Sequence, residues 1–165
     1  MRVIFSHGKE SGPWGSKIKY LAGIAEAMGC QVDSIDYTDT VDPELRVKHL
    51  LTTMPQDDPE VLLVGSSMGG YVSLVAALEQ PVKGIFLLAP AVGMPGYKVQ
   101  DFPVACPVTC VHGWQDEIIP AENVLAFAKK QNATLHLIPG DHRLNHSLKA
   151  VGVVFKQFLF ERLTE

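Results

Sequence analysis

Short apolar runs alternate with amphipathic segments along the whole chain. The apolar runs are rich in β-branched and aromatic residues and have the length of buried strands, which predicts strands at residues 2–6, 30–37, 61–64, 82–88, 107–111 and 134–138. In the segments between them, apolar residues recur every three or four positions, which predicts helices at residues 16–28, 42–54, 68–78, after Pro120 and from Asn145 onward. Residues 89–103 contain three prolines and two glycines and are predicted to be irregular.

Small polar residues stand at the predicted beginnings of three of the helices. Ser16, Asp42 and Asn145 are expected to be the N-caps, since their side chains can accept hydrogen bonds from the first turn. Pro43 fits the first helical position after Asp42, and Gly29 fits the residue that ends the first helix. The expected boundaries therefore agree with the periodicity of the apolar positions.

Regular alternation of apolar strands with amphipathic helices predicts a parallel sheet with helices on both faces, a three-layer α/β fold. We find no internal repeat or linker, and 165 residues suit a single domain spanning residues 1–165. In open sheets of this kind, ligands bind beyond the carboxyl ends of the strands. Candidate chemistry is therefore sought in the loops that follow the strands.

Composition narrows the classes of function. The formal net charge of −4 argues against a nucleic-acid partner, and we expect neither a signal peptide nor a membrane-spanning segment. The three cysteines lack metal-ligand spacing and are odd in number, so neither a zinc site nor a disulfide framework is expected. We expect a cytoplasmic protein, a monomer or weak homodimer, with no metal or organic cofactor.

One glycine-bracketed serine follows the third predicted strand directly. Gly65, Ser67 and Gly69 form G-x-S-x-G, the pattern of a nucleophile elbow, in which the serine occupies a tight turn between a strand and a helix. Side chains two residues before and after the serine would collide in that turn, and glycine removes them. The backbone N–H of Met68, at the beginning of the helix, would face the serine oxygen and stabilise an oxyanion.

Two further loops supply the partners that a nucleophilic serine needs. A histidine must accept the serine proton, and a carboxylate must hold that histidine in the correct tautomer. Asp116 follows the fifth strand and is favoured over the neighbouring Glu117 by the spacing from Gly113. His142 follows the sixth strand and is favoured over His146, which falls in the first turn of the last helix. The chain order Ser, Asp, His is that of alpha/beta-hydrolase triads.

The loop after the first strand is expected to complete the oxyanion hole. Gly8 allows the backbone to approach closely, and the N–H of Lys9 is the favoured second donor. Lys9 and Glu10 could equally contact the substrate or remain a solvated charge pair. His7 and His112 are assigned no chemistry.

Four segments of the chain resemble motifs of the alpha/beta-hydrolase superfamily. His7-Gly8 resembles the oxyanion motif of that family, and residues 65–69 resemble its nucleophile elbow. Gly113-x-x-Asp116 with Ile119-Pro120 resembles its acid loop, and His142 corresponds to its terminal histidine. The chain is similar to a minimal, lidless serine esterase or thioesterase, which implies a mostly parallel six-stranded sheet in the order 2-1-3-4-5-6. It departs from the family in lacking the usual first two strands and a cap domain between the fourth and fifth strands.

The sequence therefore predicts a serine hydrolase that cleaves small-molecule carboxylic esters or thioesters through an acyl-enzyme on Ser67. Four large side chains could line an acyl pocket, although each could equally be ordinary packing: Trp14, Met94, Tyr97 and Trp114. A peptidase or an acyltransferase on the same fold is not excluded. The alternative from another class is a catalytically silent binding or scaffold protein.

Overall fold

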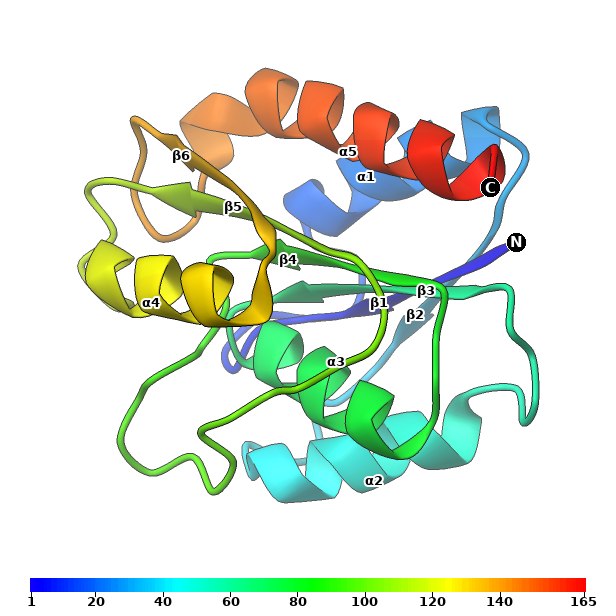
Figure 1. Ribbon diagram of the computed structural model, residues 1–165, viewed down its shortest axis with the longest axis horizontal. Helices are drawn as coiled ribbons and strands as arrows, with labels where there is room; N and C mark the ends of the chain where they lie inside the picture. Colours follow the sequence, from blue (N-terminus) through cyan, green and yellow to red (C-terminus); the bar gives the residue numbers. More distant parts are fainter.

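The computed structural model describes residues 1–165 as one six-stranded sheet with helices on both faces (Figure 1). All strand pairs are parallel, and the spatial order is β2-β1-β3-β4-β5-β6, which confirms the predicted fold. The strands are β1 (Arg2–Ser6), β2 (Gln31–Ile35), β3 (Val61–Ser66), β4 (Gly84–Leu88), β5 (Val108–Gly113) and β6 (Thr134–Ile138). The helices are α1 (Ser16–Ala27), α2 (Pro43–Thr53), α3 (Met68–Glu79), α4 (Ala121–Gln131) and α5 (Leu148–Leu163).

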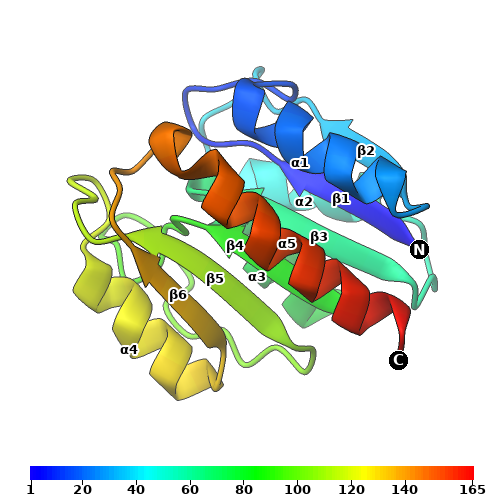
Figure 2. The ribbon, with the colours of Figure 1, turned by 90° about the horizontal axis from the view of Figure 1, so that it is seen from above.

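The two faces of the sheet bury separate apolar clusters. Helices α1 and α5 cover one face, and α2, α3 and α4 cover the other (Figure 2). Successive strand residues alternate between the clusters, as the pleat of a strand requires: Leu63 belongs to the α2–α3–α4 side, whereas Leu62 and Val64 belong to the α1–α5 side. The central strands are buried on both sides, which explains why their sequences are continuous apolar runs.

Helix boundaries agree with the sequence in part. Asp42 caps α2, its carboxylate accepting from two N–H groups of the first turn, and Pro43 is the first helical residue. Gly29 has a φ of +86° just past α1, as its position predicted. Two cap predictions were wrong. Gly15, not Ser16, is the N-cap of α1, and Asn145 begins a short 3₁₀ turn (Asn145–Ser147) ahead of α5.

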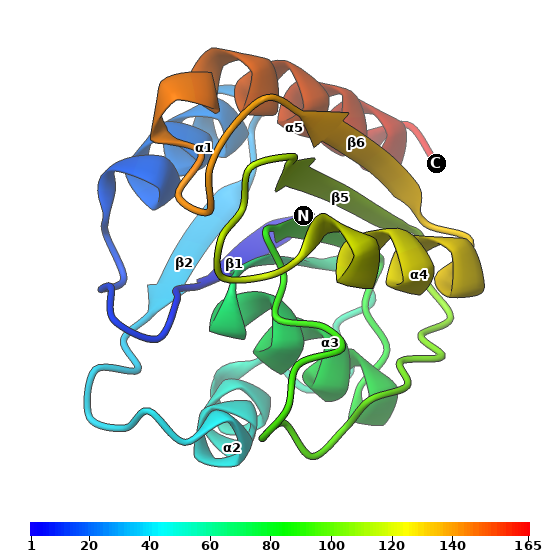
Figure 3. The same ribbon diagram turned by 90° about the vertical axis from the view of Figure 1, so that its left-hand side faces the viewer.

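The loops after the carboxyl ends of β1, β3, β5 and β6 gather at one edge of the sheet, seen face-on in Figure 3. The chain runs from β4 to β5 without an intervening helix, so no helical cap covers that edge. None of the helices combines the length and apolar character needed to cross a bilayer.

Candidate active site

The turn between β3 and α3 holds Ser67 in a conformation that few residues adopt. Its φ is +54° and its ψ is −116°, a strained backbone state of the kind found at functional turns. A Cβ on Gly65 would lie 2.3 Å from the carbonyl oxygen of Gly69, and one on Gly69 would lie 1.9 Å from that of Ser6. Both glycines are therefore required sterically, because β1, β3 and α3 meet here at backbone contact.

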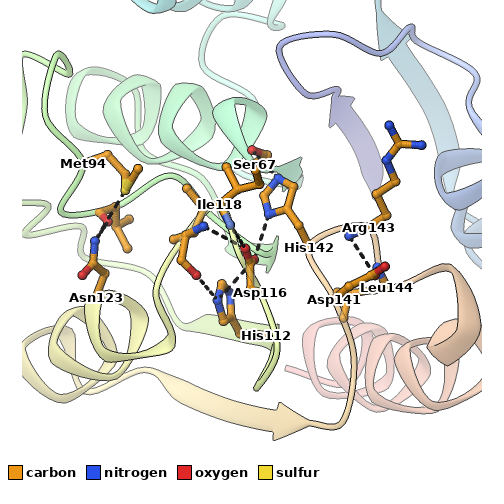
Figure 4. A network of polar contacts seen from close by, with 12 residues as sticks. Ser67, Met94, His112, Asp116, Ile118, Asn123, Asp141, His142, Arg143 and Leu144 are labelled. Atoms are coloured by element: carbon orange, nitrogen blue, oxygen red, sulfur yellow. Dashed lines mark hydrogen bonds and ion pairs between the residues drawn. The ribbon is translucent and has the colours of Figure 1, made fainter.

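Three predicted side chains from three loops come together at this edge (Figure 4). The Oγ atom of Ser67 lies 3.0 Å from Nε2 of His142, and Nδ1 of His142 lies 2.8 Å from Oδ2 of Asp116. The carboxylate of Asp116 is fully buried, whereas the imidazole of His142 is about one-fifth exposed, at 22%. An imidazole so placed can donate from Nδ1 to the carboxylate while Nε2 accepts the serine proton.

The carboxylate of Asp116 is held by its own loop. Oδ1 accepts from the backbone N–H groups of Ile118 at 2.8 Å and Ile119 at 2.7 Å, which leaves Oδ2 for His142. Burial by itself would raise the pKa of Asp116, but the hydrogen bonds from His142 and from the two N–H groups outweigh it and keep that pKa below its ordinary value. Asp116 therefore remains an anion at neutral pH.

The loop after β6 that carries His142, the histidine loop, is held by hydrogen bonds on both sides. Oδ1 of Asp141 accepts from the backbone N–H groups of Arg143 and Leu144, a tight turn centred on His142. Nζ of Lys17, at the beginning of α1, donates to the carbonyl oxygen of Arg143 at 3.1 Å. These contacts determine where the imidazole stands.

The acid loop and the histidine loop are also joined directly. Gln115 N–H donates to the Gly140 carbonyl at 3.0 Å, and Gly140 N–H donates to the side-chain oxygen of Gln115 at 2.8 Å. A Cβ on Gly113 would lie 2.2 Å from the Gly140 carbonyl oxygen, so this junction requires glycine. The spacing between Asp116 and His142 is therefore fixed by backbone contact.

The two predicted oxyanion donors belong to Met68, directly after the serine, and to Lys9, in the loop after β1. Met68 is the first residue of α3, and the first N–H groups of a helix have no partner within it. Gly8 lies against the elbow, since a Cβ on it would be 3.7 Å from both Cβ of Ser67 and the carbonyl oxygen of Ser66. Lys9, which follows Gly8, has an exposed side chain, as has Glu10.

The four candidates for an acyl pocket differ in exposure. Trp14 is 46% exposed and Trp114 is 55% exposed. Met94 and Tyr97 are partly buried against the core, with the Tyr97 ring 4.8 Å from that of Tyr71. Both lie in the irregular segment between β4 and β5, and their assignment to an acyl pocket stays a prediction.

The alternatives kept open by the sequence, Glu117 and His146, are both exposed, and neither forms a hydrogen bond with the serine, which pairs with His142. His112, to which the sequence reasoning gave no role, lies fully buried with Nε2 3.4 Å from Oδ2 of Asp116. Its position directly before Gly113 is the only local signal that could have suggested this. No three His, Cys, Asp or Glu side chains form a group suited to a metal ion.

Comparison with known proteins gives a consistent result. Residues 2–102 match the Uncharacterised protein family (UPF0227), whereas no curated protein sequence matches the chain. A protein from Xanthomonas campestris pv. campestris, described as a predicted hydrolase of the alpha/beta superfamily, is 34% identical over 97% of each chain, with a TM-score of 0.89.

More distant solved structures share the fold. Est1E from Butyrivibrio proteoclasticus with bound ferulic acid is 20% identical over 99% of this chain and 90% of that one, with a TM-score of 0.82. The alpha/beta hydrolase domain-containing protein 10 from mouse is 20% identical over 97% of this chain and 90% of that one, with a TM-score of 0.79. At these identities the similarity concerns the fold alone.

Proposed function

Because the chain belongs to the alpha/beta-hydrolase superfamily and to the Uncharacterised protein family (UPF0227), we propose that it is a serine hydrolase that cleaves carboxylic esters or thioesters. One observation carries the proposal: a continuous hydrogen-bonded path from Ser67 through His142 to the buried carboxylate of Asp116. Each of the three positions has the residue type that nucleophilic catalysis needs.

In the first half-reaction the serine hydroxyl attacks the substrate carbonyl. The bond from Oγ of Ser67 to the carbonyl carbon forms as the hydroxyl proton passes to Nε2 of His142, 3.0 Å away. Asp116 stabilises the resulting imidazolium through Nδ1. The tetrahedral intermediate then collapses, the bond to the leaving oxygen or sulfur breaks, and His142 returns the proton to the leaving group.

The second half-reaction repeats these steps with water. His142 accepts a proton from water as the water oxygen attacks the acyl-enzyme, and it returns that proton to Oγ of Ser67 as the carboxylic acid leaves. In both halves the negative charge on the carbonyl oxygen would be stabilised by the N–H groups of Met68 and Lys9. Losing one such donor typically costs about 3 kcal/mol of transition-state stabilisation.

The open edge of the sheet supports small or extended acyl substrates. Because no helix lies between β4 and β5, little protein is available to enclose a bulky acyl group. We place Trp14, Met94, Tyr97 and Trp114 around the substrate as a working proposal. A small-molecule substrate and a monomeric or weakly dimeric state stay predictions.

Labelling with a fluorophosphonate probe, read by intact mass, tests the proposal first. The wild type should gain a single adduct, Ser67→Ala should gain none, and Ser66→Ala should label as the wild type does. Matched oxygen esters, thioesters and peptide amides of one acyl chain then define the substrate class. A folded wild type that takes no label and cleaves none of these would instead favour the silent binding protein.

A further inference from the structure

Arg46, in the first half of α2, is a buried cation without a carboxylate partner. Its side chain is 1% exposed, yet it forms none of the ion pairs of the molecule. Removing a guanidinium from water costs several kcal/mol unless other groups replace its hydration. Here two of the three replacement carbonyls belong to the loop after β1, the predicted oxyanion loop, and the third, that of Thr40, lies between β2 and α2.

The guanidinium binds that loop through its carbonyl oxygens. Nη1 donates to the Gly8 carbonyl at 3.0 Å, Nη2 donates to the Lys9 carbonyl at 3.1 Å, and Nε donates to the Thr40 carbonyl at 2.8 Å. The ring of Tyr37 lies 5.5 Å from the guanidinium carbon, at a distance typical of cation–π contacts. The five donors of arginine's planar fork let it reach three separate carbonyls at once.

The carbonyl of Gly8 is the best-held group of the loop. Besides Arg46, it accepts from Nδ1 of the buried His7 at 2.8 Å and from Oγ of Ser11 at 3.4 Å. The other nitrogen of His7, Nε2, accepts from the backbone N–H of Tyr37, which fixes the imidazole in the neutral form with its proton on Nδ1.

Holding this carbonyl fixes the neighbouring donor. In a trans peptide the C=O of Gly8 and the N–H of Lys9 point in opposite directions, and the chain contains no cis peptide bond. The N–H of Lys9 therefore points away from Nη1 of Arg46, and the residue before it, Gly8, lies beside Ser67, since an added Cβ would be 3.7 Å from Cβ of Ser67. Charge-assisted hydrogen bonds to the carbonyl also polarise the peptide and strengthen its N–H as a donor.

We propose that Arg46 is a positioning residue for the oxyanion hole, acting through the Gly8–Lys9 peptide to fix and polarise the Lys9 N–H. The role rests on the proposed serine hydrolase function. A donor held in advance by a buried guanidinium costs no reorganisation when negative charge develops on the substrate oxygen. The benefit is therefore realised in the transition state and should appear in kcat.

Three variants separate this role from simple structural support. Arg46→Met removes the donors and keeps much of the side-chain volume, and Arg46→Lys keeps the charge but cannot span the carbonyls. Arg162→Met is the matched control, since Arg162 is a second buried arginine, on α5, that pairs with Glu165. Each is measured for hydrolysis of p-nitrophenyl butyrate and for inhibition by a trifluoromethyl ketone with the same alkyl chain.

Losing a donor outright lowers kcat by about 10²–10³, so a donor left in place but poorly oriented should cost about 10- to 100-fold. We expect this loss in both Arg46 variants, with KM changed less than about threefold. The ketone, which forms an oxyanion on Ser67, should lose affinity by the same factor as kcat/KM falls. Arg162→Met should retain kcat and ketone affinity.

A readout without turnover keeps the two proposals distinct. Backbone NMR order parameters of Gly8 and Lys9 should fall from about 0.85 to below about 0.6 in the Arg46 variants and stay high in Arg162→Met. If the wild type is inactive and the Arg46 variants still lose order at Gly8 and Lys9, the proposed function is overturned, and what remains is that Arg46 orders the Gly8–Lys9 peptide. If a folded Arg46 variant keeps the kcat, the ketone affinity and the loop order of the wild type, the positioning role is overturned. If Arg46→Met does not fold, Arg46→Lys decides by the same criteria.

Discussion

Nε2 of His112 lies 3.4 Å from Oδ2 of Asp116, and both side chains are fully buried. The same nitrogen lies 2.9 Å from the carbonyl oxygen of Ile119 and donates its proton there. Burial lowers the pKa of His112, and the hydrogen bond to Ile119 and the charge of Asp116 oppose this only in part, so the ring is neutral at pH 7. His112 therefore braces the acid loop without placing a positive charge beside His142.

Replacing His112 with leucine should affect activity more than stability. The variant loses the hydrogen bond to Ile119 and loosens the loop that orients Asp116, so we expect kcat to fall about tenfold. It also removes Nδ1, a buried nitrogen without a partner, so the free energy of unfolding should change by less than about 1 kcal/mol. Steady-state kinetics and urea denaturation measure both quantities.

His136→Leu, on the neighbouring strand β6, is the matched control for losing one histidine from the sheet and should retain kcat. A folded His112→Leu protein with wild-type kcat would contradict the bracing role.

Asp116→Asn should keep the shape of the acid loop and lose most of the activity. The amide carries no negative charge to fix the tautomer of the imidazole and stabilise the imidazolium, and loss of the carboxylate typically lowers kcat by about 10⁴. Glu117→Gln removes a neighbouring exposed charge and should stay within about twofold of the wild type. The rates of both variants on one chromogenic ester check this. An Asp116→Asn protein that loses no more activity than Glu117→Gln would show that Asp116 is not the carboxylate of the triad.

The fold was predictable because each element carries its own local signal. Residues 61–64 are apolar at every position because β3 is covered on both faces, and Asp42-Pro43 begins α2 through backbone chemistry alone. Ser16 and Asn145 failed as caps because tertiary packing moved the N-cap by one residue in α1, to Gly15, and by two in α5, to Ser147. Local sequence indicates that a helix begins nearby, but the first turn is set by its neighbours.

The candidate site was predictable only in part. Ser67, Asp116 and His142 follow strands, and a parallel sheet brings such loops to one edge whatever their separation in sequence. The sequence gives no indication of a role for Arg46, because an arginine on an amphipathic helix is usually one more solvent-facing polar residue. Its partners in the β1 loop lie 37 and 38 residues earlier in the chain, and only the packing of α2 against that loop reveals the contact.

The glycines of the elbow allow a paired test of close packing. Gly69→Ala would place a Cβ 1.9 Å from the Ser6 carbonyl oxygen, against backbone that cannot move aside, so we expect at least about 3 kcal/mol of destabilisation or failure to fold. Gly23→Ala, in α1, meets no atom within 4 Å and should stabilise by about 0.5–1 kcal/mol. Thermal unfolding of the two variants compares them, and a Gly69→Ala protein as stable as the wild type would contradict this close packing of α3 against β1.

The lowered pKa of Lys17 predicts that the free energy of unfolding rises at alkaline pH. Burial lowers its pKa to about 8, although the nearby charges of Asp141 and Asp116 favour the charged form. The folded pKa therefore lies below the value of about 10.4 expected for the unfolded chain. Between these two values the unfolded chain holds a proton that the folded protein has released, so the free energy of unfolding gains a term that increases with pH.

In Lys17→Met the pH-dependent contribution of the lysine proton to the free energy of unfolding is absent. The unfolding free energy of the wild type minus that of the variant should therefore increase from about pH 8 to about pH 10 and then level off. Guanidinium denaturation at several pH values measures the difference, and Lys19→Met, an exposed lysine on the same helix, controls for the loss of one positive charge. A difference that stays constant over this range would show that Lys17 keeps its proton on folding and that its hydrogen bond to Arg143 is made in solvent.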